Sequence, residues 1–412
     1  MTAQIKLKHS GGNGVIIEAP ASNPASDKTI TLPSTESGVF ATKDSANSLQ
    51  NVTGINGGQL SNRNLIINGA MLVAQRGTSS TVDGYGTVDR FKCDHGTVDE
   101  APTQAQVDVT SGTEPYTKGF RKAFKITNGN QTSGAQAASV VRCRYCVEAQ
   151  DMANSGWNYL SSSSSITLSF YIKSSIAQNF FCDLHTSDGT AQGFSFQTGS
   201  LSADTWTKIT KTIPGNSNLT FNNDNGNGIF ININGFMGTS FTTSGHTLDT
   251  WGAFTGSSRM PDNTTTWYTT NNSTLEITGV QLEVGSVATD FEHRSFAQEF
   301  ALCQRYFEKS FEIGTAPAQS VSEGVGYYLL HSEGNSLRSV NVHFKVPKRT
   351  DPTMTYFNPY AANANARLPF SSTDLAGIAT NTLSNYWFSF HSSDNTPSPT
   401  LAHLMWTASA EL

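Results

Sequence analysis

The chain has 412 residues, of which 14% are charged and 10% are aromatic, and its formal net charge is −6. This length predicts about two or three domains, and the aromatic content can supply their cores, which argues against disorder throughout. The negative charge and the lack of Lys/Arg clusters argue against nucleic-acid binding, and no apolar run approaches the ~20 residues of a membrane span.

The composition favours short strands. Charged residues are scarce compared with the ~25% of a typical globular protein. Ser, Thr, Asn and Gly are abundant, with 35 glycines, and these residues favour turns over helices. We therefore expect an all-β protein with polar loops.

The five cysteines do not indicate a disulfide framework, because their number is odd and they are widely spaced. Cys143 and Cys146 form a lone C-x-x-C, but positions i and i+3 of a strand face opposite ways. Two further ligands for a zinc ion are not found at a credible spacing. We expect ordinary buried or half-buried thiols, with a zinc or redox pair as the alternative, and we predict no metal and no cofactor.

Residues 1–33 contain three β-like runs, at 4–8, 14–18 and 28–32. Three such strands carry too little apolar surface for a core of their own, so we interpret them as an anchoring or assembly segment. The alternative is a frayed tail. Residues 34–62, rich in Ser, Thr, Asn and Gly, are expected to be a linker. Lys6 separates Ile5 from Leu7, so no signal-peptide core is present and we expect no secretion by that route.

Residues 63–294 are expected to form a β-sandwich. Strand-like runs separated by turns rich in Asn, Gly and Ser occur at 120–127, 138–148, 166–174, 179–185, 205–213, 228–234 and 275–284. Regularly spaced strands of this kind are typical of all-β sandwiches.

The segment that follows predicts a change from strand to helix. Leu275 and Ile277 alternate in one phase and Val280 and Leu282 in the other, which requires an extra residue at a bulge near Thr278–Gly279. Ser295 and Gln298 have the spacing of a capping box. Phe296, Phe300, Cys303 and Phe307 then follow as one apolar helix stripe. We predict a connecting helix at 295–309 whose stripe forms an assembly or interdomain seam.

Residues 310–412 are expected to be a small β-rich tip domain, with strands at 325–331, 339–346, 354–357 and 386–391. The sequence LAHLMWTASAEL ends the chain as a further strand. A unit of this size can fold alone and would gain stability from contacts between copies.

The order RNLIINGAMLVAQRG, GYGTVDRF, LSFYIKS, DTWTKITKTIPG and ITGVQLEVGSVATDFEHRSFAQEFALCQRYFEKS resembles that of a tailed-bacteriophage tail-fibre or virion structural protein. The part from Arg63 to about Arg294 resembles the jelly-roll domain that such proteins share with carbohydrate-binding modules. This resemblance implies a virion component, commonly trimeric, that presents β domains to the host surface. It also implies that Leu65–Gly69 lies near the strand at 275–284.

The sequence departs from the sugar-binding relatives at one position. Many of them carry an acidic residue just after the N-x-G of the first strand, which helps to bind a structural calcium. Here Asn68-Gly69 is followed by Ala70-Met71-Leu72, which supplies none of the oxygen ligands that calcium requires. We therefore expect no calcium at this position, and we interpret the oxygen-rich run 222–228 as a turn.

No catalytic site is predicted. Nucleophile, P-loop and zinc-protease motifs are absent. Five acidic residues cluster in sequence, and paired carboxylates can cleave glycosides; they are Glu276, Glu283, Asp290, Glu292 and Glu299. We interpret Glu276 and Glu292 as rim residues, and Glu299 as a first-turn residue that suits the helix dipole.

The candidate glycan-binding residues are Trp251, Arg259, Asp262, Trp267 and Tyr268, which lie in one polar stretch without strand alternation. Aromatic rings stack on sugars, polar groups bind the hydroxyls, and loops commonly carry recognition. The alternative is that Trp251 and Trp267 cap the sandwich core. Tyr386 and Trp387 form a second aromatic candidate, for which core packing is the alternative.

The sequence thus predicts a non-enzymatic phage virion protein, a homotrimeric tail fibre that binds host cell-surface polysaccharide. It would attach to another virion protein through residues 1–62, and would lie on the tail or capsid surface after synthesis in the host cytoplasm. A capsid decoration or head-fibre protein is the first alternative, and a polysaccharide depolymerase is the second.

Overall fold

The computed structural model describes residues 62–333, 336–369, 371–394 and 400–412, together with four short strands nearer the N-terminus. The chain divides into two compact units, residues 1–53 and 54–412. In the first, β1 (Gln4–Lys8) pairs with β2 (Gly14–Glu18), and β3 (Thr42–Lys43) pairs with β4 (Leu49–Gln50). The predicted strands at 4–8 and 14–18 are confirmed. The predicted strand at 28–32 and most of the predicted linker lie outside the described residues.

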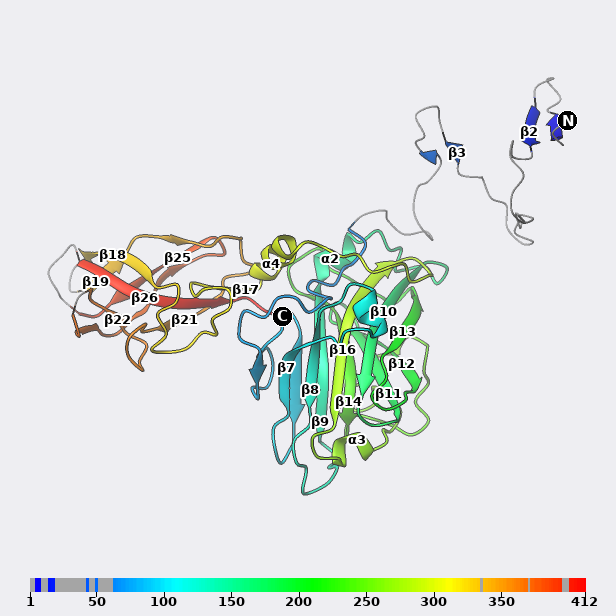
Figure 1. Ribbon diagram of the computed structural model, residues 1–412, viewed down its shortest axis with the longest axis horizontal. Helices are drawn as coiled ribbons and strands as arrows, with labels where there is room; N and C mark the ends of the chain where they lie inside the picture. The colour runs from blue at the N-terminus through cyan, green and yellow to red at the C-terminus, as the bar shows by residue number, and fades with distance from the viewer. Residues whose placement is uncertain are drawn as a thin grey trace. The chain divides into compact units, whose positions relative to one another are not determined.

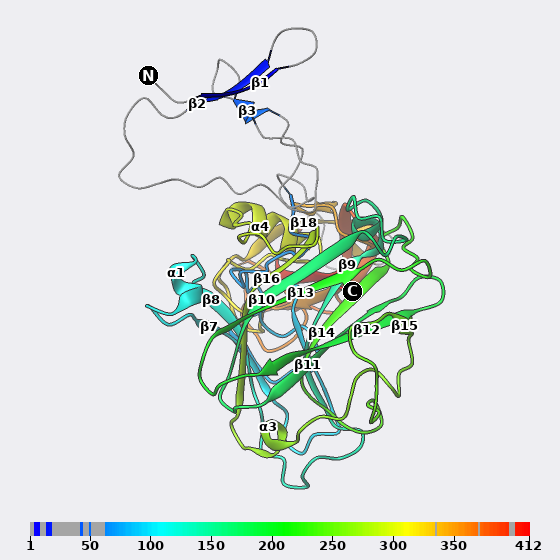
Figure 2. The same ribbon diagram turned by 90° about the vertical axis from the view of Figure 1, so that its right-hand side faces the viewer.

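The second unit begins with a sandwich of two six-stranded antiparallel sheets (Figures 1 and 2). Sheet A has the spatial order β13 (Thr207–Pro214), β10 (Ser165–Ser174), β16 (Thr274–Val284), β8 (Lys122–Thr127), β7 (Thr103–Asp108) and β5 (Ser79–Ser80). Sheet B has the order β15 (Gly252–Ala253), β12 (Gln192–Ser200), β11 (Asn179–Thr186), β14 (Asn227–Met237), β9 (Val140–Glu148) and β6 (Lys92–Gly96).

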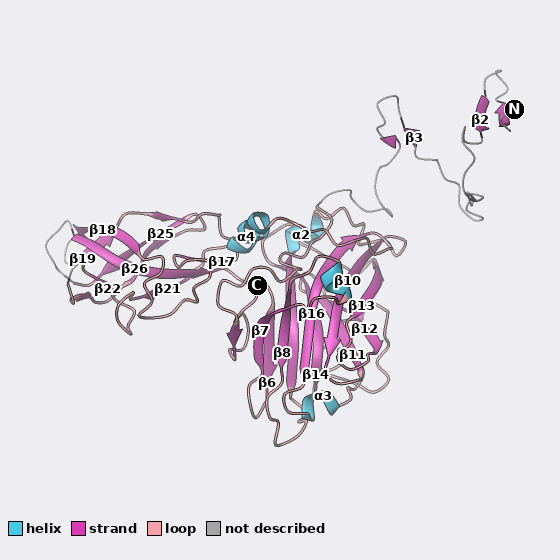
Figure 3. Cartoon of the chain, in the orientation of Figure 1, coloured by secondary structure: helices cyan, strands magenta, loops and turns pink. Residues whose placement is uncertain are grey.

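Strands dominate the fold and the helices are short (Figure 3). The helices of the sandwich are α1 (Glu114–Thr117), α2 (Ala149–Ala153) and α3 (Thr266–Thr269). In Figure 3, α2 and α3 lie at opposite ends of the strands. None of the helices in the described part of the chain is long and apolar enough to cross a membrane. The predominance of strands and their arrangement in two packed antiparallel sheets confirm the prediction of an all-β jelly-roll sandwich.

The core lies between the two sheets, because the apolar residues alternate toward it on every long strand. Sheet A contributes the residues Leu168 and Phe170 of β10, and sheet B contributes Phe194 of β12 and Ile231 of β14, all at most 2% exposed. All five cysteines are buried thiols, as predicted.

The predicted bulge in β16 is present one residue further along the chain. Thr278 pairs with Tyr171 and Gln281 with Ser169, so Gly279 and Val280 together oppose one residue of β10. Gly279 has φ +64°, a conformation that glycine adopts without strain. The bulge returns Val280 to the core face, where Leu275 and Ile277 also lie.

The first residues of the sandwich lie beside its last strand, as the resemblance implied. The Leu65 amide donates to Leu282 O over 2.9 Å, and the Val280 amide donates to Gly69 O over 3.0 Å. A Cβ at position 69 would lie 2.0 Å from Val280 O, so only glycine permits this approach.

The helix after β16 is α4 (Phe296–Gln304), and its predicted capping box is present. Ser295 Oγ accepts from the Gln298 amide, and the Gln298 side chain accepts from the Ser295 amide. The predicted extension of this helix to residue 309 is wrong, because α4 ends at Gln304. Phe307 instead begins β17 (Phe307–Lys309), which pairs with the last strand of the chain.

The C-terminal part forms a ten-stranded sheet around β26 (Thr400–Ser409). This strand pairs with β17, β18 (Gly326–Glu333), β21 (Thr353–Phe357) and β22 (Ala366–Arg367). The predicted strands at 325–331, 354–357 and 386–391 correspond to β18, β21 and β25. The one predicted at 339–346 is broken into β19 and β20. The other strands of this sheet are β19 (Ser336–Ser339), β20 (Val342–His343), β23 (Asp374–Leu375), β24 (Ala379–Leu383) and β25 (Trp387–Ser392).

Buried polar contacts join this sheet to the sandwich within one chain. Arg305 Nε donates to Glu148 over 2.7 Å, and the Lys309 ammonium donates to Gln75 O over 2.8 Å. Cys303 and Phe307 of the predicted assembly seam are 0% and 5% exposed. Those two side chains therefore lie in an intrachain seam between the sandwich and the C-terminal sheet, which is the interdomain alternative, and the prediction of an assembly seam is wrong for them.

The other two residues of the predicted seam are more accessible. Phe300 is half-buried against a small cluster that includes Ile67 and Tyr306. Phe296 is 46% exposed, and its ring stacks on Phe300 with centroids 5.8 Å apart.

Candidate functional site

Two of the five predicted glycan-binding residues lie in the core. Trp267 and Tyr268 are the two central residues of α3 and are 0% and 1% exposed. The Trp267 ring packs on Gly235, where a Cβ would lie only 2.7 Å from the indole, and Tyr268 stacks on Phe236. Neither ring can stack on a sugar, so that prediction is wrong for both. The two rings close one end of the sandwich, as the alternative proposed for Trp267.

Two other predicted residues, Trp251 and Arg259, line one pocket on sheet B, which is described below. Trp251 is 7% exposed, packs on Phe194 and donates from Nε1 to Pro214 O over 2.7 Å. Most of its ring therefore belongs to the core. The fifth, Asp262, is exposed and accepts from Thr242 Oγ1 over 2.6 Å. It does not line the pocket.

The pocket has a volume of about 250 Å³ and lies on sheet B, at the edge formed by β11, β12 and β15. The loop between β14 and β15 and the residues after β15 complete it. The principal lining residues are Asp183, His246, Trp251, Phe254, Ser258 and Arg259. A concave site with apolar walls and a few converging polar groups is the usual form of a small-ligand site.

A buried carboxylate lies in this pocket. Asp183 is 2% exposed and accepts hydrogen bonds of 2.9 Å from the amide groups of Asn232 and Asn234 on β14. Burial alone would raise the pKa of Asp183, but the neighbouring His185 ring and the charge of Arg142 outweigh it, and the pKa lies below its ordinary value. Asp183 is therefore ionised at neutral pH and can accept hydrogen bonds from ligand hydroxyls.

Three aromatic rings form a stack next to this carboxylate. The His185 ring lies between Phe254, at a centroid distance of 4.3 Å, and Phe230, at 4.7 Å. Burial lowers the pKa of His185, which favours the neutral ring. Gly193 makes room for the stack, because a Cβ there would lie 3.3 Å from the Phe254 ring. The polar pocket thus has an aromatic wall beside it.

Two arginines on β9 extend the polar face of sheet B toward β6. Arg142 and Arg144 contact Asp94 at 3.1 and 3.0 Å, and Arg144 also donates to Asn232 Oδ1 over 2.8 Å. Because Asn232 in turn donates to Asp183, a continuous line of polar contacts crosses four strands.

The sequence contains a signal for this face that the prediction missed. Asp183 and His185 alternate with apolar residues on β11, as do Asn232 and Asn234 on β14. In strands that pair side by side, such alternation places all four side chains on one face. Register is set by long-range pairing, so the match between the two strands was not readable from either one alone.

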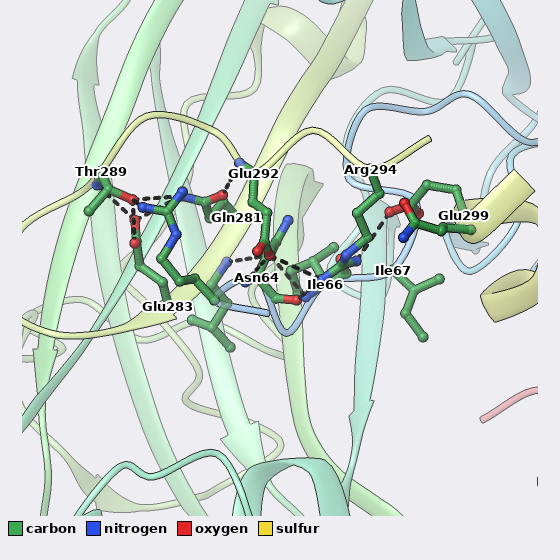
Figure 4. A network of polar contacts seen from close by, with 12 residues as sticks. Asn64, Ile66, Ile67, Gln281, Glu283, Thr289, Glu292, Arg294 and Glu299 are labelled. Atoms are coloured by element: carbon green, nitrogen blue, oxygen red, sulfur yellow. Dashed lines mark hydrogen bonds and ion pairs between the residues drawn. The ribbon is translucent and has the colours of Figure 1, made fainter. Parts of the chain in front are cut away.

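Four of the five acidic residues near β16 have structural roles, whereas the Asp290 side chain is 95% exposed. Glu283 accepts from the Thr289 amide over 2.8 Å, and Glu292 accepts from the Asn64 amide over 2.9 Å (Figure 4). Arg294 contacts Glu299 at 3.1 Å, and Glu299 also accepts from the Asn68 amide. This network fastens the start of the sandwich to the segment after β16.

Glu276 is also engaged, because it is 8% exposed and contacts Lys173 at 2.9 Å. The interpretation of Glu276 as an exposed rim residue is therefore wrong. Within the described ranges, no group of three or more His, Cys, Asp or Glu side chains could hold a metal ion.

A larger hollow of about 590 Å³ lies on the outer face of sheet A, lined in part by Phe120, Tyr171, Phe291 and His293. Its rings contact one another, His293 bonds to Lys118 O and Tyr171 donates to Glu114. None of the buried side-chain polar atoms that lack a partner in the described part of the chain lines this hollow. The pocket on sheet B, by contrast, contains one in Arg259.

Comparisons with known proteins give distant structural similarity only. No family model matches the chain, and no curated protein matches it. Among solved structures, it is similar to the enzymatically active domain of tailspike protein 4 from bacteriophage CBA120, with 9% identity and a TM-score of 0.28. The match covers 54% of this chain but only 21% of that chain.

Two carbohydrate-binding structures are also similar. The N-terminal cellulose-binding domain of β-1,4-glucanase C from Cellulomonas fimi has 10% identity and a TM-score of 0.25, with 53% of this chain and 99% of that chain covered. The CBM22-1–CBM22-2 tandem domain of Xyn10C from Paenibacillus barcinonensis has 8% identity and a TM-score of 0.28, with 87% and 92% covered. None of these similarities assigns the chain to a family.

Proposed function

We propose that this protein is a non-enzymatic carbohydrate-binding component of a phage virion, a homotrimeric tail fibre that attaches to host cell-surface polysaccharide. The observation that supports binding is the pocket on sheet B. It combines the ionised Asp183, held by Asn232 and Asn234, with the partly exposed ring of Phe254. Sugars present both hydroxyls and apolar C–H faces, and this pair of surfaces suits both.

Binding is tested on an array of immobilised bacterial O-antigen and capsular polysaccharides, followed by titration calorimetry with each polysaccharide bound. We expect Phe254→Ala to weaken affinity at least tenfold, because it removes the aromatic wall. Phe296→Ala is the matched control, since Phe296 is 46% exposed on α4, outside the pocket. Equal affinity of the Phe254→Ala variant and wild type would place the site elsewhere, and no binding to any polysaccharide would reject the function.

The same samples test the depolymerase alternative. We expect no new reducing ends after prolonged incubation with each polysaccharide bound, because four of the five clustered carboxylates near β16 are engaged in structural contacts. Release of oligosaccharides would replace the proposed function with the enzymatic one.

The virion assignment rests on the sequence order described above. Self-association is supported by an uncovered apolar surface on the C-terminal sheet, where Tyr327 is 63%, Leu329 43% and Leu401 38% exposed. Leu329 and Leu401 are direct register partners on β18 and β26, so their side chains adjoin. Sedimentation of the purified protein measures the number of copies, and labelled antibody on intact particles distinguishes the tail from the capsid surface.

A further inference from the structure

The polar face of sheet B has more positive than negative charge. Asp94 is in contact with three cations, namely Lys92 at 3.5 Å and the two arginines of β9, Arg142 and Arg144, at 3.1 and 3.0 Å. One negative charge therefore faces three positive charges at the β6 end of this face, which leaves an excess of positive charge. Local positive charge of this kind attracts anions.

A fourth cation, Arg259, lies in the pocket itself. No carboxylate of the described residues lies within ion-pair distance of its guanidinium, which makes one hydrogen bond of 3.2 Å, from Nε to Gly256 O. Its Nη1 is buried and has no hydrogen-bond partner. Arginine stays charged in proteins and carries five N–H donors, so an unused buried donor here marks an incomplete interaction.

The neighbouring charged groups do not satisfy the buried Nη1 donor of Arg259. Asp183 lines the same pocket, but it forms no ion pair with Arg259, and each of its oxygens accepts one hydrogen bond from Asn232 or Asn234 and keeps acceptor capacity for a ligand. Burial, followed by the repulsive charge of Arg142, lowers the pKa of Arg259, and the charges of Asp183 and Asp94 offset this only in part. The guanidinium is held in place by the Phe254 ring, whose centroid lies 5.2 Å from its central carbon.

We propose that the saccharide bound in this pocket is anionic, and that its oxyanion is received by Arg259. A carboxylate or phosphate oxygen accepts hydrogen bonds from the guanidinium fork, satisfies the buried Nη1 and offsets the excess positive charge. The sugar ring next to the oxyanion then lies against Phe254, with its hydroxyls toward Asp183. This inference rests on the proposed carbohydrate-binding function and names its substrate class.

The oxyanion can belong to a uronic acid, a sialic acid or a phosphodiester, which share the same chemistry toward arginine. An array of polygalacturonate, alginate, polysialic acid and wall teichoic acid, with dextran and mannan as neutral polysaccharides, separates these sources. We expect binding to at least one anionic polysaccharide and to neither neutral one, and we expect it to weaken as the NaCl concentration rises several-fold above about 0.1 M, because salt screens the ion pair.

Two comparisons test the role of Arg259. Arg259→Gln is expected to lower affinity for the anionic polysaccharide at least tenfold, while Arg259→Lys keeps part of it. Arg121→Gln is the matched control, because Arg121 is exposed just before β8 of sheet A, outside the pocket, and stacks on Tyr116. For a carboxylate ligand, reduction of its carboxyl groups to alcohols should remove binding to the same extent as Arg259→Gln.

The outcomes separate this inference from the function on which it rests. Binding only to neutral polysaccharides, or unchanged affinity of Arg259→Gln for an anionic one, overturns the anionic ligand and leaves carbohydrate binding intact. No binding to any polysaccharide of the array contradicts both.

Discussion

At the scale of single residues, glycines decide where the chain can bring its parts together. Gly69 permits the contact with Val280 O, Gly193 makes room for Phe254, and Gly279 permits the bulge in β16. The glycine in β16 has two separate constraints, because its φ is +64° and a Cβ there would lie 2.7 Å from the Phe120 ring. A substitution can separate them.

We expect Gly279→Ala to destabilise the protein by the left-handed backbone cost, about 1–2 kcal/mol, plus about 1–3 kcal/mol for overpacking against Phe120. Gly134→Ala is the matched control, because Gly134 has φ +69° but a Cβ added there would meet no atom within 4 Å. It should show the backbone cost alone. Urea unfolding followed by tryptophan fluorescence measures both, and equal losses in the two variants would contradict the role of Phe120.

At the scale of elements, local patterns predicted the strands and the helix start well. The alternation in 166–174 and 275–284 and the capping box at Ser295 depend on neighbours in sequence, and all three are present in the structure. Short edge strands such as β5 and β15 have two residues each and carry no periodic signal.

The end of α4 was mispredicted for a different reason. Phe307 continues the helical apolar spacing, but long-range pairing of β17 with β26 overrides it. The candidate site was only partly predictable for the same reason. Trp251 and Arg259 were found from composition, whereas Asp183, Asn232 and Asn234 converge through strand register that the local sequence does not encode.

The docking of β17 depends on a buried ion pair. Lys348 Nζ lies 2.6 Å from Glu308 Oε2, and the two side chains are 0% and 1% exposed. Removing one partner leaves an uncompensated buried charge, so we expect Lys348→Met to cost about 3–5 kcal/mol. Adding Glu308→Gln removes that charge and keeps an acceptor for the Lys345 amide, so the double variant should recover part of the loss. A double variant as unstable as Lys348→Met in urea unfolding would show that the charge is not the cause.

At the scale of the whole molecule, the sandwich and the C-terminal sheet are joined through groups that are charged and buried. Glu148, at the end of β9, accepts from Arg305 over 2.7 and 2.8 Å and from the Tyr306 hydroxyl. Arg90 of the sandwich contacts Glu411 near the C-terminus in the same way. Polar contacts of this kind hold a fixed geometry, and they make the joint sensitive to protonation.

The pKa of Glu148 sets the direction of that sensitivity. Burial alone would raise it, but the hydrogen bonds from Arg305 and Tyr306 outweigh burial, and the pKa in the folded protein lies below the ordinary value. In acid the unfolded state therefore binds this proton more readily than the folded state. The stability that Glu148 contributes is complete above its unfolded pKa of about 4.3 and is lost as the pH falls through the folded pKa.

We therefore expect the thermal unfolding midpoint of the wild type to fall as the pH is lowered from about 6 to about 3, and Glu148→Gln to flatten this dependence while lowering the midpoint at the upper end of that range. Glu323→Gln is the control, because it makes the same chemical change on an exposed side chain. Differential scanning calorimetry at closely spaced pH values measures all three proteins. Parallel curves for the wild type and Glu148→Gln would mean that the joint between the sandwich and the C-terminal sheet does not depend on this carboxylate, and that other acidic groups determine the acid stability.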